Sequence, residues 1–165
     1  MIIGIDPGLK GGIACITDGR LLYACQMPDN IVKLFDTLYN LTKDVEVEYY
    51  VEKSQPHRST KEHREGITQI FSNGYNYGKL IGCIEIANKY CILEAKLNEV
   101  YPITWKSAFK LSKDKQKSID LCVDLYPDSR PIVYGPRGGK YDGVAEAILI
   151  AHYGYLQYQR RLKIK

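Results

Sequence analysis

Four acidic residues stand where a purely structural role explains them poorly. Asp6 and Glu52 each end a short apolar run, whereas Asp142 and Glu146 stand four residues apart, a spacing that places both on one face of a helix. Like charges at that spacing repel each other, and a bound cation would remove the conflict. Carboxylate oxygens are the ligands that Mg²⁺ prefers. The four acids are therefore candidate ligands of a divalent cation.

Each acid also has a structural interpretation. Asp6 precedes Pro7-Gly8 and could simply begin a turn. Asp142 could cap a helix, with Glu146 as an acid in its first turn, although a capping box would need the acid at position 145, which is alanine. Two acids at strand ends together with a helical acid pair are harder to dismiss as coincidence.

The surrounding patterns predict the elements that must position these acids. Apolar, β-branched runs predict strands over residues 2–5, 12–17 and 21–26, and Asp18-Gly19 favours a hairpin turn, so the chain should open with three antiparallel strands. An amphipathic helix over 30–43 and a strand over 48–52 follow. The remaining predictions are a helix over 62–89, a strand over 97–101, helices over 104–111 and 113–126, a loop over 131–140 and a helix over 141–158. Because the ends of neighbouring strands commonly meet at one edge of a mixed sheet, we expect Asp6 and Glu52 to converge.

Length and composition limit the possible classes of protein. The 165 residues predict one domain over 1–165, and 23 Lys and Arg against 19 Asp and Glu give a net charge of +4 that permits a polyanionic partner. The five cysteines form no C-x-x-C pair, so we expect reduced core residues. With neither a signal-like start nor a long apolar stretch, we expect a soluble, intracellular protein with no membrane contact.

Three motifs together resemble one known family. Ile3-Gly4-Ile5-Asp6-Pro7-Gly8, Val51-Glu52 and Asp142-Gly143-x-Ala145-Glu146-Ala147 stand in the order of the RuvC family of Holliday junction resolvases, part of the ribonuclease H-like superfamily. The resemblance spans nearly the whole chain and is closest in pattern to phage- and plasmid-type members. It implies an α/β, ribonuclease H-like fold with a mixed five-stranded sheet, antiparallel in its first three strands and flanked by helices.

The resemblance also implies an activity. Asp6, Glu52, Asp142 and Glu146 would bind two Mg²⁺ ions, with Mn²⁺ as a substitute, and hydrolyse phosphodiester bonds by a two-metal mechanism. Paired symmetric nicks in four-way DNA junctions would leave 5′-phosphate and 3′-hydroxyl ends, in recombination and repair, in the cytoplasm or where phage DNA replicates. Bacterial members usually carry two aspartates three residues apart in the last helix. Because the acids here are four apart and the second is glutamate, their division between the ions stays open.

Basic residues near the acids are candidate DNA contacts. Such clusters are often only solvated faces, but beside a phosphate-cleaving site they would bind the DNA backbone. The candidates are Arg58, Lys61, Arg64, Lys106, Lys113, Lys115, Lys117, Arg137 and Lys140. Lys106 and Lys117 resemble positions where the family keeps DNA-binding residues, with Lys115 an alternative to Lys117. No aromatic residue follows Glu52 closely, where many bacterial members stack on an unpaired base, and His57 is a possible substitute.

The predicted long helix contains glycines at successive four-residue steps, Gly74, Gly78 and Gly82, with Phe71 beside them. Glycine costs a helix about 1 kcal/mol relative to alanine, so something should approach that face closely. Packing against the protein's own sheet is one explanation. The resemblance implies another, a homodimer interface, which would set two active sites on opposite strands of a junction.

Other functions deserve comparison. The ribonuclease H-like fold also hosts nucleases that act on flaps, forks or RNA, because fold alone does not set the substrate. A junction-binding protein that does not cut is a third possibility, although retention of all four acids argues against it. The stretch Gly135–Lys140 resembles a phosphate-binding loop but is followed by Tyr141 in place of serine or threonine, which argues against nucleotide hydrolysis.

Overall fold

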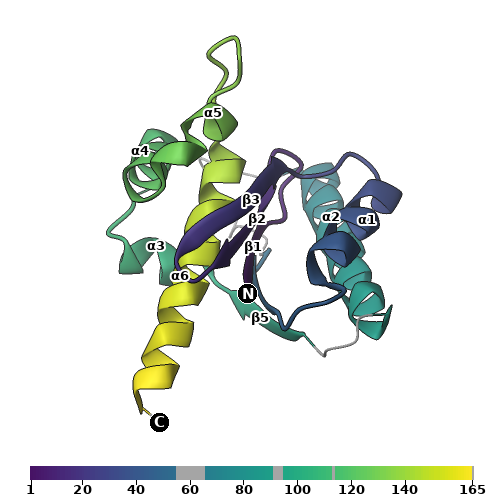
Figure 1. Ribbon diagram of the computed structural model, residues 1–165. Helices are drawn as coiled ribbons and strands as arrows, with labels where there is room; N and C mark the ends of the chain where they lie inside the picture. Colours follow the sequence, from purple (N-terminus) through teal and green to yellow (C-terminus); the bar gives the residue numbers. More distant parts are fainter. Residues whose placement is uncertain (55–65, 91–94, 113, 165) are drawn as a thin grey trace.

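The protein is built around a five-stranded mixed sheet with strand order β3-β2-β1-β4-β5 (Figure 1). The computed structural model describes residues 1–54, 66–90, 95–112 and 114–164. The strands are β1 (Ile2–Asp6), β2 (Gly12–Thr17), β3 (Arg20–Gln26), β4 (Glu48–Glu52) and β5 (Lys96–Val100). β1, β2 and β3 pair antiparallel, whereas β4 pairs parallel to β1 and β5 pairs parallel to β4. The predicted mixed sheet with three antiparallel first strands is confirmed.

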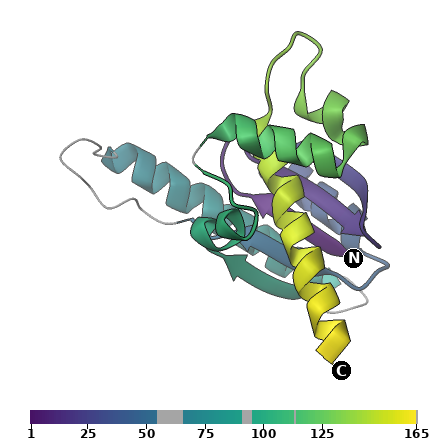
Figure 2. The same ribbon diagram turned by 90° about the vertical axis from the view of Figure 1, so that its left-hand side faces the viewer.

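Helices cover both faces of the sheet (Figures 1 and 2). On one face lie α1 (Ile31–Thr42) and α2 (Ile67–Tyr90), whose buried residues pack against Ile3 and Ile5 of β1. On the other face lies α6 (Asp142–Ile164), flanked by α3 (Pro102–Ala108) and α4 (Lys115–Leu125). None of the described helices combines the length and the apolar character needed to cross a membrane.

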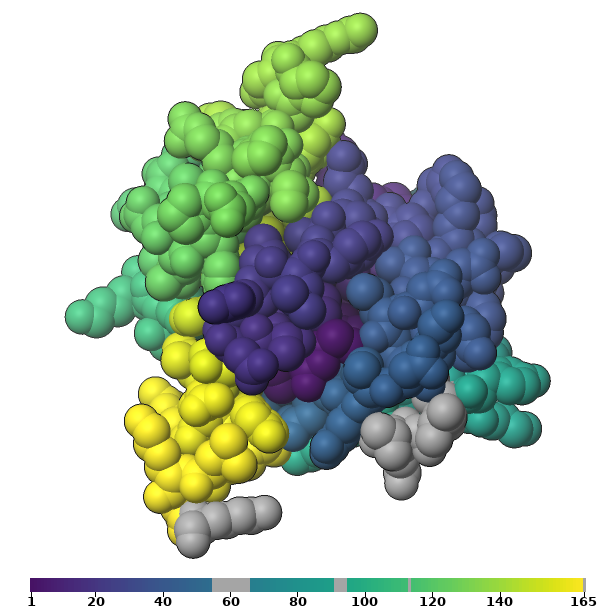
Figure 3. Space-filling view, viewed as in Figure 1, coloured from purple at the N-terminus to yellow at the C-terminus, as the bar shows by residue number. Residues whose placement is uncertain are grey.

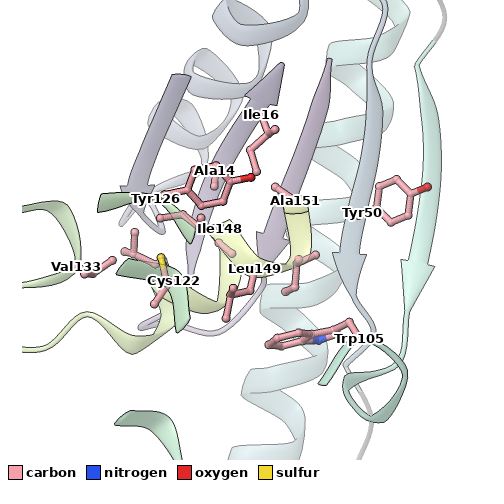
Figure 4. Packing of buried hydrophobic residues seen from close by; sticks show 14 of the residues in the cluster. Ala14, Ile16, Tyr50, Trp105, Cys122, Tyr126, Val133, Ile148, Leu149 and Ala151 are labelled. Carbon is pink, nitrogen blue, oxygen red and sulfur yellow. The ribbon is translucent and has the colours of Figure 1, made fainter. Parts of the chain in front are cut away.

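The pleat of β1 divides its side chains between the two layers. Ile3 and Ile5 face α1 and α2, whereas Ile2 belongs to the cluster that forms around α6 (Figure 4). Alternation then places Gly4 and Asp6 on the α6 side. Strand β1 is thus buried on both faces, and its last residue is a carboxylate that points toward α6.

Helix α6 lies unusually close to β1 because residue 4 has no side chain. A Cβ atom at Gly4 would lie 2.2 Å from the backbone nitrogen of Ala151 and 2.4 Å from the carbonyl oxygen of Ala147. These are backbone atoms of α6, which cannot move aside without shifting the helix. The glycine therefore sets the distance between the sheet and the helix that carries Asp142 and Glu146.

Some predicted boundaries were wrong. The first three residues of the loop predicted over 131–140 belong to the short helix α5 (Arg130–Val133), because Pro131 fits the first turn of a helix. A 3-10 turn, Pro127–Ser129, precedes α5. Helix α6 continues to Ile164, six residues beyond its predicted end at 158, with Arg161 held to Glu48 of the sheet by an ion pair of 2.6 Å. α3 begins two residues and ends three residues earlier than predicted. The predicted start of the long helix at residue 62 lies outside the described residues.

The cysteine prediction is confirmed for three positions. Cys15, Cys83 and Cys122 are free and buried, and Cys25 is free but only half-buried. Cys91 lies outside the described residues.

The close approach at Gly4 yields the first prediction. Gly4→Ala should lower the free energy of unfolding by about 3 kcal/mol, because the new methyl group overlaps backbone atoms of α6. Gly139→Ala is the control, since a Cβ there would meet nothing within 4 Å, and it should change stability by less than about 0.5 kcal/mol. Urea denaturation measures both variants, and equal stabilities would refute the close approach.

Candidate active site

The sheet brings Asp6 and Glu52 to the same edge. β1 and β4 are parallel, with Ile5 beside Val51, so the next residues along each strand, Asp6 and Glu52, end the two strands side by side. Tyr50 packs in the cluster around α6, and alternation therefore turns Glu52 to that side as well. The predicted convergence of the two strand-end acids is confirmed.

Helix α6 adds the other two acids to this edge. Asp142 is its first residue and Glu146 lies one turn further, on the same face. The helix can begin so close to the strands because residue 143 is glycine: a Cβ there would lie 2.0 Å from the carbonyl oxygen of Lys10, in the loop after β1. The acid pair predicted from sequence thus lies on a helix that packs tightly against the end of β1.

The carboxylates perturb one another. Burial raises the pKa of Asp6 to about 6. The backbone N–H of Gly8 donates to Asp6 Oδ1 over 3.1 Å and lowers this pKa, whereas the charges of Glu146 and Asp142 raise it. Burial likewise raises the pKa of Glu52 to about 7, with contributions from the charges of Asp6 and Glu146. The charges of both helical acids therefore act on Asp6, and those of Asp6 and Glu146 act on Glu52.

Two lysines supply positive charge to the helical acids. Lys106 Nζ of α3 lies 2.8 Å from Glu146 Oε1, and the buried Ser118 of α4 donates its hydroxyl to the same oxygen over 3.3 Å. Lys115 Nζ, at the start of α4, pairs with Asp142. Lys106 and Lys115 were predicted to contact DNA, and in this structure each is an ion-pair partner of a predicted metal ligand.

The strand-end acid Glu52 has a different partner. The indole N–H of Trp105, also on α3, donates to Glu52 Oε2 over 2.7 Å. The Lys106 ammonium lies 5.0 Å from the centre of the same indole ring. Adjacent residues of α3 thus contact acids that come from β4 and from α6.

The chemistry of this donor set fits a hard divalent cation. Carboxylate oxygens are its preferred ligands, and these come from three separate elements. Within the described ranges, however, no three His, Cys, Asp or Glu side chains are arranged as a ready-made metal site. Ammonium groups neutralise Glu146 and Asp142 instead, and a divalent cation would compete with them for the same oxygens.

The remaining predicted DNA contacts fall into two groups. Lys117 of α4 is exposed, and so are Arg137 and Lys140, in the loop between α5 and α6 that protrudes from the body (Figures 1 and 3). An isolated pairing of Tyr134 with Lys140 closes this loop just before Asp142. Arg58, Lys61, Arg64 and Lys113, together with His57, lie outside the described residues.

The glycine face of α2 is open. Cβ atoms at Gly74, Gly78 and Gly82 would meet nothing within 4 Å in the described part of the chain. The interpretation that these glycines admit the protein's own sheet is therefore wrong. Phe71 lies three residues before Gly74 and so on the same face of the helix; it is 73% exposed and stacks with Tyr75 at 6.5 Å between ring centres.

Sequence reasoning missed the roles of Trp105 and Ser118 at this site. Neither residue was among the candidate site residues predicted from the sequence. A single tryptophan just after a predicted strand was a usable signal, since β5 neighbours β4. Ser118 gives no comparable signal, because its relation to Glu146 depends on how α4 packs.

Comparison with known proteins supports the fold. No family model and no curated protein matches the sequence. Among solved structures, Thermus thermophilus RuvC in complex with a Holliday junction substrate is similar, with 14% identity, a TM-score of 0.57, and coverage of 95% of each chain. Another Thermus thermophilus RuvC structure has 14% identity and a TM-score of 0.55, covering 94% of this chain and 96% of that chain. The chain therefore has the ribonuclease H-like fold that RuvC has.

The raised pKa values predict how stability depends on pH. A folded-state pKa of about 6 for Asp6, against an ordinary 3.8, means that the folded protein holds the proton more tightly than the unfolded chain. The stabilisation from Asp6 is therefore full below about pH 4 and is lost as the pH rises through 6. For Glu52, whose pKa rises from 4.5 to about 7, the stabilisation is full below pH 4.5 and is lost as the pH rises through 7. In buffer free of divalent metal, Asp6→Asn should therefore stabilise the protein at pH 7.5 by about 2 kcal/mol.

Urea denaturation from pH 5 to 8 measures this effect. The wild-type protein should lose stability with rising pH more steeply than Asp6→Asn. Asp124→Asn, which changes an exposed acid of α4, should alter stability by less than about 0.5 kcal/mol. An Asp6→Asn protein less stable than wild type at pH 7.5 would contradict the prediction.

Proposed function

We propose that this protein is a divalent-metal-dependent endonuclease that resolves four-way DNA junctions by paired symmetric nicks in recombination and repair. One observation carries the proposal: Asp6, Glu52, Asp142 and Glu146 converge from β1, β4 and α6 on one edge of the sheet. A structural role does not require four acids at one edge, because their mutual repulsion and burial destabilise the free protein. The similarity to a RuvC structure with a bound junction supports the same activity.

The carboxylates are the proposed ligands of two Mg²⁺ ions, with Mn²⁺ as a substitute. When bound, such ions would lower the pKa of the attacking water and stabilise the charge of the leaving oxygen. Glu146 acts electrostatically on both Asp6 and Glu52, whereas the charge of Asp142 is felt at Asp6. Asp6, Glu52, Asp142 and Glu146 would together hold these ions.

The basic residues would hold the DNA backbone around these acids. Lys106 and Lys115 would exchange their carboxylate partners for phosphate oxygens, since a metal ion and a lysine compete for the same acids. Lys117 and the protruding residues Arg137 and Lys140 extend the positive surface. Arg58, Lys61, Arg64 and Lys113 remain proposed contacts from the sequence alone.

A homodimer would place two such sites on one junction. The open face of α2, with Phe71 and the glycines Gly74, Gly78 and Gly82, is the proposed interface, because small residues permit close approach and exposed aromatic rings supply apolar area. Attack by water at each site would leave 5′-phosphate and 3′-hydroxyl ends. The proposed subgroup is the phage- or plasmid-type resolvases, acting in the cytoplasm or where phage DNA replicates.

A flap, fork or RNA substrate is the second candidate. Glu52 is followed by Lys53 and Ser54, not by the aromatic residue with which many bacterial resolvases stack on a junction base. Substrate choice therefore needs a direct comparison.

Cleavage rates on branched and hybrid substrates distinguish the two candidate functions. Wild-type protein with Mg²⁺ should nick a synthetic four-way junction symmetrically, and cut a flap, a fork and an RNA/DNA hybrid more slowly. Asp6→Asn should bind the junction with near wild-type affinity but cut it about a thousandfold more slowly, because a metal ligand is lost. Denaturing gels give the cleavage rates and mobility shifts give binding. Preferred cutting of a flap, fork or hybrid would favour the second candidate, and binding without cutting by the wild type would indicate a junction-binding protein.

A variant on the glycine face of α2 tests whether this face forms the homodimer interface. Gly78→Arg should shift the protein toward monomer, since a long charged side chain would stand on the proposed interface while improving helix propensity. Asp124→Arg, an equally large change on α4, should leave the association unchanged. Sedimentation velocity gives the oligomeric state, and a wild-type protein that stays monomeric at all concentrations would refute the homodimer.

A further inference from the structure

Trp105 is the only tryptophan of the chain, and its side chain is fully buried at the edge of the sheet where the acids meet. Figure 4 shows its ring at the tip of the strand that carries Tyr50, among the core residues that pack around α6. Its indole nitrogen donates to Glu52 Oε2 over 2.7 Å. A buried tryptophan often only fills space, but this one directs its single polar atom at a proposed metal ligand.

The topology explains how Trp105 reaches Glu52. β5 is parallel to β4, with Val100 beside Glu52, and the backbone N–H of Lys53 donates to the Val100 carbonyl over 2.8 Å. The chain then turns directly into α3, which begins with Pro102. Trp105 therefore lies one turn into a helix that starts next to the end of β4, which is also where Glu52 stands.

The two acid partners on α3 differ in a way that matters for a metal site. Lys106 brings a positive charge to Glu146, and that charge opposes the approach of a cation. Trp105 is neutral and has one N–H, so it engages one oxygen of Glu52 and leaves the other to a metal ion. The hydrogen bond of Trp105 places no positive charge beside Glu52, whereas the Lys106 ammonium beside Glu146 would repel a bound cation.

We propose that Trp105 is a positioning residue, whose indole N–H holds the Glu52 carboxylate in the orientation that binds a divalent metal ion. This inference rests on the proposed function, because it takes Glu52 as a metal ligand. Glu52 sits at the last position of its strand, where the backbone alone leaves the side chain several rotamers. A fixed hydrogen bond removes that freedom before the ion arrives, as outer-shell partners of metal ligands generally do.

The single tryptophan allows a test that changes one atom. Growth of a tryptophan auxotroph on β-(3-benzothienyl)alanine replaces the indole N–H by sulfur while keeping the two fused rings, and it alters only position 105. Growth on 4-fluorotryptophan keeps the N–H and is the matched control. Because the ring is retained in both proteins, their packing should be similar, and thermal unfolding without metal checks that it is.

The main measurement is binding of Mn²⁺, followed by electron paramagnetic resonance of the free ion. The benzothienyl protein should bind Mn²⁺ about tenfold more weakly than wild type, and the fluorotryptophan protein should bind it like wild type. Junction cleavage by the benzothienyl protein should recover toward the wild-type rate as Mg²⁺ is raised, since the carboxylate is still present. A residue that only supports the core would not shift the metal dependence in this way.

Two genetic variants give an independent comparison. Trp105→Phe removes the N–H and part of the ring, whereas Tyr126→Phe removes a buried hydroxyl that lies 2.7 Å from His152 Nδ1, on the core side of α6. Both lose one hydrogen bond from the same apolar cluster. Only Trp105→Phe should weaken Mn²⁺ binding.

The outcomes separate this inference from the proposed function. A wild-type protein that binds no Mn²⁺ and cuts no nucleic acid would refute the proposed function, and the role of Trp105 with it. If the wild type binds Mn²⁺ and cuts while the benzothienyl protein has the same Mn²⁺ affinity, only the role of Trp105 is overturned. Weakened binding in both the benzothienyl protein and Tyr126→Phe would also overturn it, since loss of any core hydrogen bond would then suffice.

Discussion

The repulsion among four carboxylates at one edge of the sheet is the constraint to which the rest of this structure responds. Burial and mutual charge raise the pKa of Asp6 and of Glu52 above the ordinary values of aspartate and glutamate. Two ammonium groups, from Lys106 and Lys115, neutralise the acids of α6. The partners come from α3 and α4, so the region between β5 and α6 supplies the counter-charges for acids that the sheet and the last helix bring together.

The close packing of α6 against β1 brings the four carboxylates together and so creates their repulsion. Without a side chain at Gly4, α6 lies directly on β1, and without one at Gly143 the helix begins beside the loop that follows Asp6. Looser packing would move the acids of α6 away from Asp6 and so weaken their mutual repulsion. Under the proposed function, the free protein gives up stability at neutral pH for a concentrated set of oxygen ligands, a trade often found at functional sites.

The fold separates two kinds of surface. The acids and the protruding loop with Arg137 and Lys140 meet around the start of α6, whereas the open glycine face lies on α2, across the sheet from that helix (Figures 1 and 2). A second copy on α2 would therefore leave the acid edge free for DNA. The same overall fold occurs in RuvC at 14% identity, which shows how few residues this architecture requires.

The sequence alone determined the local elements and the identity of the four acids. Apolar, β-branched runs, the Asp18-Gly19 turn and the apolar face of α1 indicated the antiparallel strands and the first crossover helix, because these signals depend on residues close together in the sequence. The convergence of Asp6 and Glu52 was an expectation, and the tertiary structure supplied the parallel pairing of β1 with β4 that sets them side by side. Only that structure decided which groups neutralise or orient the acids. The bonds of Lys106 to Glu146, Lys115 to Asp142 and Trp105 to Glu52 join residues far apart in the chain, so no local pattern encodes them, and they form only when α3 and α4 pack beside the edge of the sheet.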